Sequence, residues 1–454
     1  MNEDSPLPEN QETQRRNRSI SSAVATSLAS KVGTVILQFV SIPIAYHKLG
    51  EEDFGLYSTI AVSISTLILF QIGIGPALTH GISRASSTGN KILEKQYFST
   101  SWFLLAALGT LGGLLATLAL TFVPITFFLG EKYIGLEDKL LPGLWLALVI
   151  ILIEFILSHT ERAREGLLQS HLNNIFGAAG NILGALAVGI GIHFFNSIEF
   201  LVLAVFGTRA IVRVANTAYL FWQRPELFPR LSFFKPPLAR EMLSDGLAFT
   251  VSHSLTGFVE VNLCGWLVAR HLGPVAVGHF QILTQLATLL LGMIIMFTTP
   301  IWPAVVDAFT RKDTPWIRRI ATKVQAGVAL YGLAIIIFLP TIGPFALSII
   351  FKGLELSWIL LLPFAFHFTT SAWAHATSSL LIGVGQVRRV AIISLVETVV
   401  LFGISWLGLS LFGLPGLFAG MAFVTAAISC WMFPVALKRK IHEEPAQATA
   451  ATTP

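Results

Sequence analysis

Two stretches of this sequence decide the fold, His47-Lys-Leu-Gly-Glu-Glu-Asp-Phe-Gly-Leu-Tyr57 and Arg270-His-Leu-Gly-Pro-Val-Ala-Val-Gly-His-Phe280. Their Leu-Gly pairs and the glycines and aromatic residues that follow match at a spacing of 223 in the numbering. After an apolar segment, Pro76-Ala77 and Ser83-Arg84 match Pro303-Ala304 and Thr310-Arg311 at a spacing of 227. Because these matches extend beyond the apolar runs, we interpret the stretches as a duplicated transmembrane hairpin rather than as chance similarity.

The composition places the chain in a bilayer. Of its 454 residues 54% are hydrophobic and only 12% are charged, and the mean hydropathy is +0.72, which excludes an ordinary soluble protein. The basic residues behind the net charge of +5 lie between apolar segments rather than along one polar face, so they indicate membrane topology and not nucleic-acid binding. The two cysteines, Cys264 and Cys430, lie in apolar runs and predict no disulfide framework.

The sequence predicts an all-α polytopic membrane protein. About twelve segments approach the length of about 20 residues that crosses the hydrocarbon, at roughly residues 20–46, 54–78, 97–123, 140–158, 173–195, 198–222, 244–269, 274–303, 322–350, 357–381, 390–412 and 414–436. If the N-terminus is inside, 22 of the 30 Lys and Arg residues fall on cytoplasmic segments. This asymmetry predicts that both termini are cytoplasmic.

The spans divide into two lobes of six helices. A polar segment rich in proline, residues 223–243, falls near the middle of the chain. The first apolar run is too long for the core of a cleaved signal peptide and should remain as a span. We therefore expect a disordered cytoplasmic tail at residues 1–18, an N-lobe at 19–222, a cytoplasmic linker at 223–243, a C-lobe at 244–437 and a cytoplasmic tail at 438–454, disordered after Ile441.

Polar residues recur at helical spacing inside several spans, on faces that cannot point at lipid. The stripes are Ser27, Lys31, Thr34, Gln38 and Ser41; Arg209, Arg213 and Asn216; His253, Thr256 and Glu260; Gln281, Gln285 and Thr288; and His367, Ser371, His375 and Ser378. A charge at the bilayer centre costs about 2.5 to 3.5 kcal/mol. Arg209 and Arg213 therefore predict a hydrated cavity that handles an anion. The alternatives are an internal ion-pair network with Glu154 or Glu397, or snorkelling of Arg213 to the membrane surface.

If the cavity exists, its candidate substrate-binding residues are Lys31, Gln38, Arg209, Arg213, Asn216, Glu260, Gln281 and Gln285. The residues His367, His375 and Glu397 are candidates for proton coupling, although a buried histidine is also a common hydrogen-bonded packing residue. There is no Walker-type loop, HExxH motif or cysteine-rich metal pattern. We therefore expect no enzyme activity, no metal and no cofactor.

The chain resembles the polysaccharide transporter family, the O-antigen-type flippases, in the superfamily that also holds multidrug-and-toxin extruders. The residues that carry the resemblance are Leu49-Gly-Glu-Glu-Asp-Phe-Gly-Leu-Tyr57, Gly73-Ile-Gly-Pro-Ala-Leu-Thr-His-Gly-Ile-Ser-Arg84, Leu272-Gly273 with Gly278, and Leu380-Leu-Ile-Gly-Val-Gly-Gln-Val-Arg-Arg389. Twelve spans fit this family better than the related lipid II flippases, which commonly have fourteen. Relatives often carry an acidic residue where this chain has Gln71, which puts ion coupling through that position in doubt.

The resemblance implies two lobes with pseudo-two-fold symmetry and a central cavity in a bacterial inner membrane protein. By alternating access it would carry an undecaprenyl-diphosphate-linked oligosaccharide to the periplasmic leaflet, for O-antigen, capsule or exopolysaccharide assembly. Expected partners are this lipid-linked substrate, membrane lipids, a coupling proton or sodium ion and other polysaccharide-assembly membrane proteins. The alternatives are a multidrug exporter of the same fold, which would need carboxylates for organic cations, and a polytopic enzyme of glycan assembly.

Overall fold

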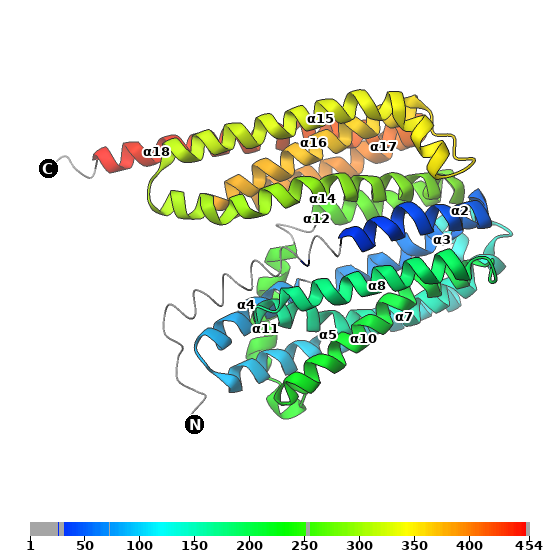
Figure 1. The fold of residues 1–454 in the computed structure, drawn as a ribbon, viewed down its shortest axis with the longest axis horizontal. Coiled ribbons are helices and arrows are strands. Elements are labelled where there is room, and N and C mark those ends of the chain that lie inside the picture. The colour runs from blue at the N-terminus through cyan, green and yellow to red at the C-terminus, as the bar shows by residue number, and fades with distance from the viewer. Residues whose placement is uncertain (1–25, 27–30, 72, 251–254, 451–454) are drawn as a thin grey trace. The chain divides into compact units, whose positions relative to one another are not determined.

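The computed structural model describes residue 26 and residues 31–71, 73–250 and 255–450. In this part of the chain all regular structure is helical. The chain forms two compact units, unit 1 from Met1 to Thr250 and unit 2 from Val251 to Pro454 (Figure 1). The expected N-terminal tail, Ser27 of the first stripe and His253 of the seventh span lie outside the described residues.

Unit 1 begins with a helix from Lys31 to Leu49. Its later part consists of η1 (Leu37–Ser41), a π-helical turn, and α2 (Ile42–Leu49). The helices that follow are α3 (Glu51–Ser65), η2 (Thr66–Gln71), α4 (Ile74–Ser87), α5 (Lys91–Phe122), α6 (Ile125–Leu129), η3 (Glu131–Tyr133), α7 (Glu137–Gly166), α8 (Ser170–Gly191), α9 (Ile198–Val202), η4 (Leu203–Gly207), α10 (Thr208–Gln223), η5 (Pro225–Leu227), η6 (Leu231–Phe233) and α11 (Pro236–Phe249).

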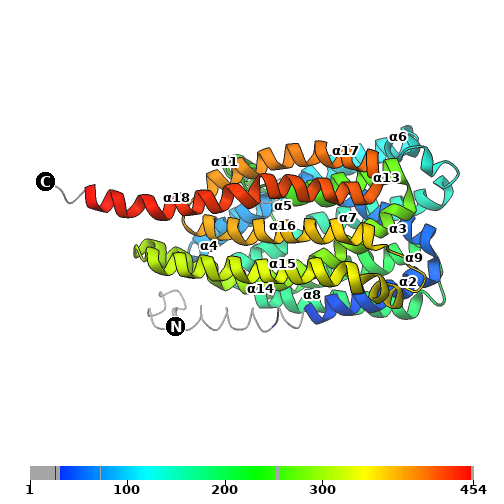
Figure 2. The same cartoon turned by 90° about the horizontal axis from the view of Figure 1, so that it is seen from above.

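Unit 2 consists of α12 (Leu255–Phe258), η8 (Val259–Leu263), α13 (Cys264–Leu272), α14 (Pro274–Thr310), α15 (Thr314–Ile350), α16 (Trp358–Gly383), α17 (Val387–Ala427) and α18 (Ser429–Ala450). Helix α16 packs on both α15 and α17 (Figure 2). Helix α18 continues to Ala450, where the sequence suggested a disordered tail after Ile441.

Seven helices in the described residues are long and apolar enough to cross a membrane. One of them, Val387–Ile441, holds two crossings, because Gly413 (φ 65°, ψ −148°) breaks α17 where the sequence predicted the turn. The remaining crossings do not meet this criterion of length and hydropathy, because their helices are interrupted or less apolar. Counted with them, the described helices make the predicted twelve crossings of a multi-pass membrane protein.

Several backbone features occur in both units at an almost constant offset in residue number. The π-helical turns η1 and η8 are offset by 222 in the numbering, and the helices after them end at Gly50 (φ 83°) and Gly273 (φ 88°), offset by 223. Both glycines combine positive φ with extended ψ, a conformation that is essentially restricted to glycine. The duplicated hairpin read from the sequence therefore has a structural counterpart.

The spacing of 223 continues to the start of the third span in each unit. Gly89 (φ 67°) and Lys312 (φ 60°) hold equivalent left-handed positions. Asn90 Oδ1 then accepts a hydrogen bond from the backbone N–H of Leu93 (3.0 Å), and Asp313 Oδ1 accepts one from Trp316 (3.1 Å), so both side chains cap a helix. The spacing of 227 expected around Pro76 and Pro303 is therefore wrong.

The second helix differs between the units. In unit 2 it is the continuous α14, whereas in unit 1 it is α3, η2 and α4, with Gly73 in a left-handed conformation (φ 58°) at the start of α4. A Cβ atom on Gly73 would lie 2.1 Å from the carbonyl oxygen of Gly246 in α11. Helix α11 packs on α4 and α5, so residues 244–249, assigned by the sequence to the seventh span, belong to unit 1.

Unit 1 is longer by six residues at one place. Gly130 (φ 87°) and Gly353 (φ 89°) still match at 223, but the left-handed residues Leu168 and Gly385 match at 217. The extra residues therefore lie between Gly130 and Leu168. They include an additional turn at the start of α7, which begins at Glu137, whereas the start of α16 at Trp358 corresponds to residue 141 of α7.

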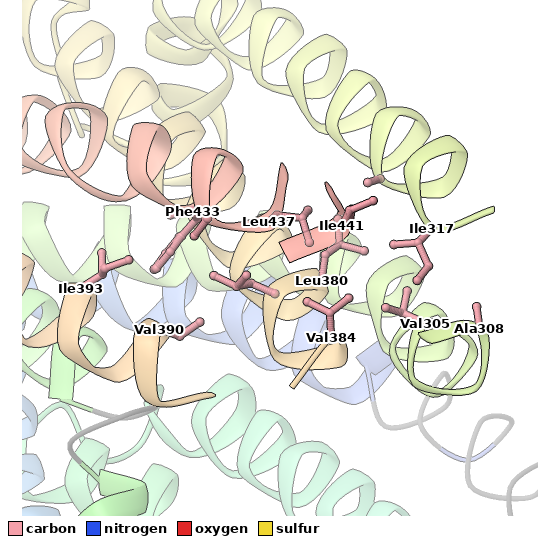
Figure 3. Close-up of a cluster of buried hydrophobic side chains, with 14 residues drawn as sticks. Val305, Ala308, Ile317, Leu380, Val384, Val390, Ile393, Phe433, Leu437 and Ile441 are labelled. Atoms are coloured by element: carbon pink, nitrogen blue, oxygen red, sulfur yellow. The ribbon is translucent and has the colours of Figure 1, made fainter. Parts of the chain in front are cut away.

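An apolar cluster holds one end of unit 2 together. Phe433, Leu437 and Ile441 recur at steps of four along α18 and point at Leu380 and Val384, while Val305 and Ile317 close the cluster from α14 and α15 (Figure 3). The cluster positions the α17 and α18 ends that the loop charges assign to the cytoplasm.

Candidate functional site

The polar stripe of the first span packs on α8. Asn181 Nδ2 donates to Thr34 Oγ1 (2.8 Å), and Ser41 Oγ donates to the carbonyl oxygen of Ala185 (2.9 Å). Lys31 is half-buried, and Gln38 Oε1 is buried without a hydrogen-bond partner among the residues that the structure describes. Part of this predicted cavity face therefore joins two helices, which leaves Gln38 as its unsatisfied member.

Arg209 and Arg213 share one carboxylate. Glu154 Oε2 lies 3.3 Å from Arg209 Nη2 and 3.3 Å from Arg213 Nη1. Arg213 Nε also lies 3.0 Å from Oε1 of Glu161. The alternative of an ion-pair network with Glu154 is thus realised. Among the described carboxylates, Arg213 pairs with two and Arg209 with one.

The two ends of this network differ in burial. The Glu154 side chain is only 1% exposed, and its Oε1 atom has no hydrogen-bond partner in the described part of the chain. The Arg209 side chain is 41% exposed. An ion pair in which one partner is partly exposed can accept a further polar group at that partner. A fully buried pair would first have to separate.

The exposed part of Arg209 does not lie on the apolar face of its helix. The exposed apolar side chains of η4 and α10 form a stripe, Leu203, Ile211, Val214 and Trp222. At about 100° per residue, Arg209 and Arg213 project from the opposite side. An exposed apolar stripe suits lipid, so the exposed guanidinium of Arg209 lies on the side of α10 that faces away from it.

A third arginine lies at the end of α7. Arg164 is completely buried, and its Nε donates to Asn216 Oδ1 (2.7 Å). Its Nη1 donates to Gln169 Oε1 (2.8 Å) and to Gln223 Oε1 (3.2 Å). All of these acceptors are neutral side-chain amides. The buried Asn216 is therefore a hydrogen-bond partner of Arg164.

Arg209, Arg213, Glu154 and Glu161 are joined by ion pairs. Arg164 contacts Asn216 one turn away from Arg213 and pairs with neither carboxylate among the described residues, and we count it with these four as the arginine–glutamate network. Three guanidinium groups stand against two carboxylates, so the network carries an excess of one positive charge. Arg guanidinium groups present planar donors that suit the oxygens of phosphate and carboxylate groups. The arrangement can therefore attract an anion.

Unit 2 carries acidic groups instead. Glu397 is buried and accepts a hydrogen bond from Ser429 Oγ. Glu260, in the π-helical turn η8, is half-buried and is an electrostatic neighbour of Glu397. Among the described residues no salt bridge involves either carboxylate. We call Glu260, Glu397, His367, Ser371 and Ser429 the acidic cluster.

The remaining candidate residues of unit 2 are two histidines on α16 and two glutamines on α14. His367 is buried, and its Nδ1 lies 3.4 Å from Ser371 Oγ, which places it with the acidic cluster. His375 is half-buried two turns further along α16. Gln281 and Gln285 are half-buried on one face of α14. In the described residues no group of three or more His, Cys, Asp or Glu side chains could hold a metal ion.

Sequence reasoning missed Arg164 and Glu161. Both had been assigned to the cytoplasmic loop after the fourth span, but α7 continues to Gly166 and brings them beside α10. A spacing of seven residues between Glu154 and Glu161 was the available signal, since it places both carboxylates on one helical face. Gln71, at the position where the resemblance implies an acidic residue, donates to Ser158 Oγ (3.3 Å).

Comparison with known proteins agrees with the resemblance. Residues 22–309 match the family described as polysaccharide biosynthesis protein. A Salmonella typhi protein named "Putative O-antigen transporter" is 22% identical over 426 residues, which cover 90% of this chain and 94% of that protein.

Solved structures show the same fold. An inward-facing multidrug resistance MATE family transporter of the MOP superfamily matches with a TM-score of 0.75 at 14% identity, over 94% of this chain and 100% of that one. A MOP superfamily transporter from Pyrococcus furiosus matches with a TM-score of 0.64 at 15% identity, over 95% and 96%. With more than half of its length matched by the family model, the chain belongs to the polysaccharide biosynthesis protein family and has the fold of the MOP superfamily.

Proposed function

We propose that this protein is a flippase that moves a lipid-linked oligosaccharide with a diphosphate group from the cytoplasmic to the periplasmic leaflet of a bacterial inner membrane. The family match and the likeness to an O-antigen transporter support a polysaccharide substrate. The observation that carries the proposal is Arg209, whose side chain is partly exposed on the side of α10 opposite the apolar stripe and lies in the arginine–glutamate network.

In this proposal Arg209 is the group that meets the diphosphate. Arg213 keeps Glu154 and Glu161 as partners when Arg209 turns to the substrate, so the buried Glu154 is never left without a cation. Lys31 and Gln38 supply further polar contacts from the first span. Asn216 acts indirectly, because its side chain holds Arg164.

The acidic cluster would couple transport to protons. A carboxylate inside a membrane without a cationic partner is stable mainly in its neutral form. Glu260 and Glu397 would then take up a proton on one side and release it when the cluster becomes hydrated. The proton-coupling half of the mechanism would also include His367, His375, Gln281 and Gln285. Membrane partners in polysaccharide assembly would supply and remove the substrate.

The test is transport of a lipid-linked oligosaccharide by the purified full-length protein in proteoliposomes. We expect Arg209→Ala to insert at a normal level and to lose transport, and Arg209→Lys to recover only part of it, because a point charge replaces a bidentate fork. The matched control is Arg162→Ala, which removes an exposed arginine paired with Glu165 in the same unit. Wild-type transport by Arg209→Ala would disprove the proposal.

A multidrug exporter is the second candidate, and a specific observation favours it. Glu260 and Glu397 are carboxylates without a cationic partner among the described residues, which is the chemistry that an organic cation needs. Drug resistance in cells that express the protein, abolished by Glu397→Gln and unaffected by Arg209→Ala, would favour this exporter over the flippase.

A further inference from the structure

A groove runs between α17 and α18 at the end of unit 2 that the loop charges assign to the cytoplasm. Its volume is about 640 Å³, and Arg388, Arg389 and Arg439 are among the residues that line it. Because the part of α17 before Gly413 runs antiparallel to α18, its first turn meets the later part of α18, and the three arginines gather at one end of the groove.

This end of the groove is strongly cationic. No acidic residue lines it, and among the described side chains no carboxylate pairs with any of the three arginines. The first N–H groups of α17 add the positive end of a helix dipole at the same place. The neighbouring Lys440 differs, since its Nζ lies over the ring of Phe309 at 5.4 Å.

The other end of the groove is apolar. Trp431 is 71% exposed, and the adjacent Met432 is exposed as well. Ile392, one turn after Arg388 in α17, is exposed between this end and the arginines. Trp431 precedes Arg439 by eight residues, so it lies about 12 Å further along α18, away from the charged end. The opposite side of α18 is already used, because Phe433, Leu437 and Ile441 point into the apolar cluster (Figure 3).

We propose that this groove binds an anionic phospholipid of the cytoplasmic leaflet. The lining changes from charged to apolar along its length, as a phospholipid does from phosphate to acyl chain. The phosphate would lie against Arg388, Arg389 and Arg439, whose guanidinium groups form bidentate hydrogen bonds with phosphate oxygens. An acyl chain would lie along Ile392, Trp431 and Met432. A zwitterionic lipid fits less well, because its own cation would face three arginines.

The test measures lipid binding to the full-length protein in nanodiscs. Quenching of tryptophan fluorescence by brominated phosphatidylglycerol is compared with quenching by brominated phosphatidylcholine, and a Trp431→Phe variant gives the contribution of Trp431. We expect phosphatidylglycerol to quench Trp431 preferentially. Replacing Arg388, Arg389 and Arg439 together by Gln should weaken this preference about tenfold or more, since each basic residue near the membrane contributes to anionic lipid binding.

The matched control replaces Arg319, Lys438 and Lys440 by Gln, which removes the same charge from this side of unit 2 outside the groove. We expect this control to keep the preference. Equal losses in the two triple variants, or no preference in the wild-type protein, would overturn the proposal. So would displacement of phosphatidylglycerol by a polyprenyl diphosphate at low concentration, because the groove would then belong to the substrate path.

Discussion

Units 1 and 2 keep the same backbone but place different chemistry on it. The second residue of the π-helical turn is Gln38 in unit 1 and Glu260 in unit 2. At the spacing of 217 that joins Leu168 to Gly385, Glu154 corresponds to Ser371 and Gly180 to Glu397. Each unit thus carries carboxylates where its counterpart is neutral.

The surroundings of the carboxylates differ as well. In unit 1 Arg209 and Arg213 neutralise Glu154, whereas the twelfth span, residues 414–437, contains no charged residue that could neutralise Glu397. What the units preserve are glycines with positive φ, helix caps and π-helical turns, since these determine the path of the chain. Under the proposed function, the duplication allowed unit 1 to specialise in the anionic substrate and unit 2 in the proton.

The largest effect is expected for Glu154→Ala. This change leaves Arg209 with no acidic partner and Arg213 with only Glu161, and breaking a buried pair costs about 3–5 kcal/mol. We expect a strongly lowered melting temperature in detergent or loss of the protein from the membrane. The counterpart Ser371→Ala should have a small effect. Equal, small effects in the two variants would mean that the network does not stabilise unit 1.

Glu397→Gln should abolish proton uptake during transport while the protein stays folded. The amide has nearly the same shape and can still accept the Ser429 hydrogen bond, but it cannot exchange a proton. Proton movement is measured with a pH-sensitive dye in proteoliposomes, together with binding of the lipid headgroup, which should be unchanged. If proton uptake persists in Glu397→Gln and also in Glu260→Gln, coupling does not occur in the acidic cluster.

Gly50→Ala and Gly273→Ala should destabilise the protein by similar amounts. No atom lies within 4 Å of a Cβ added at Gly50, so there the cost is one of backbone conformation, about 1–3 kcal/mol. Thermal unfolding of the purified variants gives this cost. A silent change at one glycine and a severe one at the other would contradict the equivalence of the two hairpins.

The smallest effect is expected at the turn before the third span of each unit. Lys312 has φ 60° where Gly89 has φ 67°. A left-handed conformation costs a residue with a Cβ atom roughly 1–2 kcal/mol, so Lys312→Gly should raise the free energy of unfolding slightly and Gly89→Ala should lower it. The two substitutions should therefore change the free energy of unfolding in opposite directions, and chemical denaturation measures both changes.

Much of the fold could be predicted from the sequence, because hydropathy and the distribution of Lys and Arg report directly on crossings. The twelve crossings and the turn at Gly413 are examples. The left-handed conformation of Gly73 could not be predicted, because it accompanies the close approach of Gly246, which lies far away along the chain. The sequence placed residues 244–249 in the seventh span although they lie in α11 of unit 1, since the local apolar pattern does not reveal the packing partner.

The candidate site was predictable only in part. Spacing placed Arg209 and Arg213 on one face, and the cost of burying charge made Glu154 a candidate partner. The loop charges, however, were treated as solvent-exposed, so Arg164 and Glu161 were overlooked although α7 brings them into the network. Asn216 was expected to meet substrate, but its side chain is used by Arg164. Such pairings depend on tertiary contacts that the periodicity of one helix does not contain.

The six additional residues between Gly130 and Leu168 show where this architecture accommodates a change in chain length. They include an additional turn at the start of α7. In this turn Lys139 Nζ donates to Asp53 Oδ1, which lies in the first turn of α3 (2.8 Å). The counterpart, Gly353 to Ser357, is the shorter version of the same connection. A protease site or epitope tag inserted after Gly353 should therefore be tolerated, which makes this connection a suitable place to attach a probe without disturbing either site.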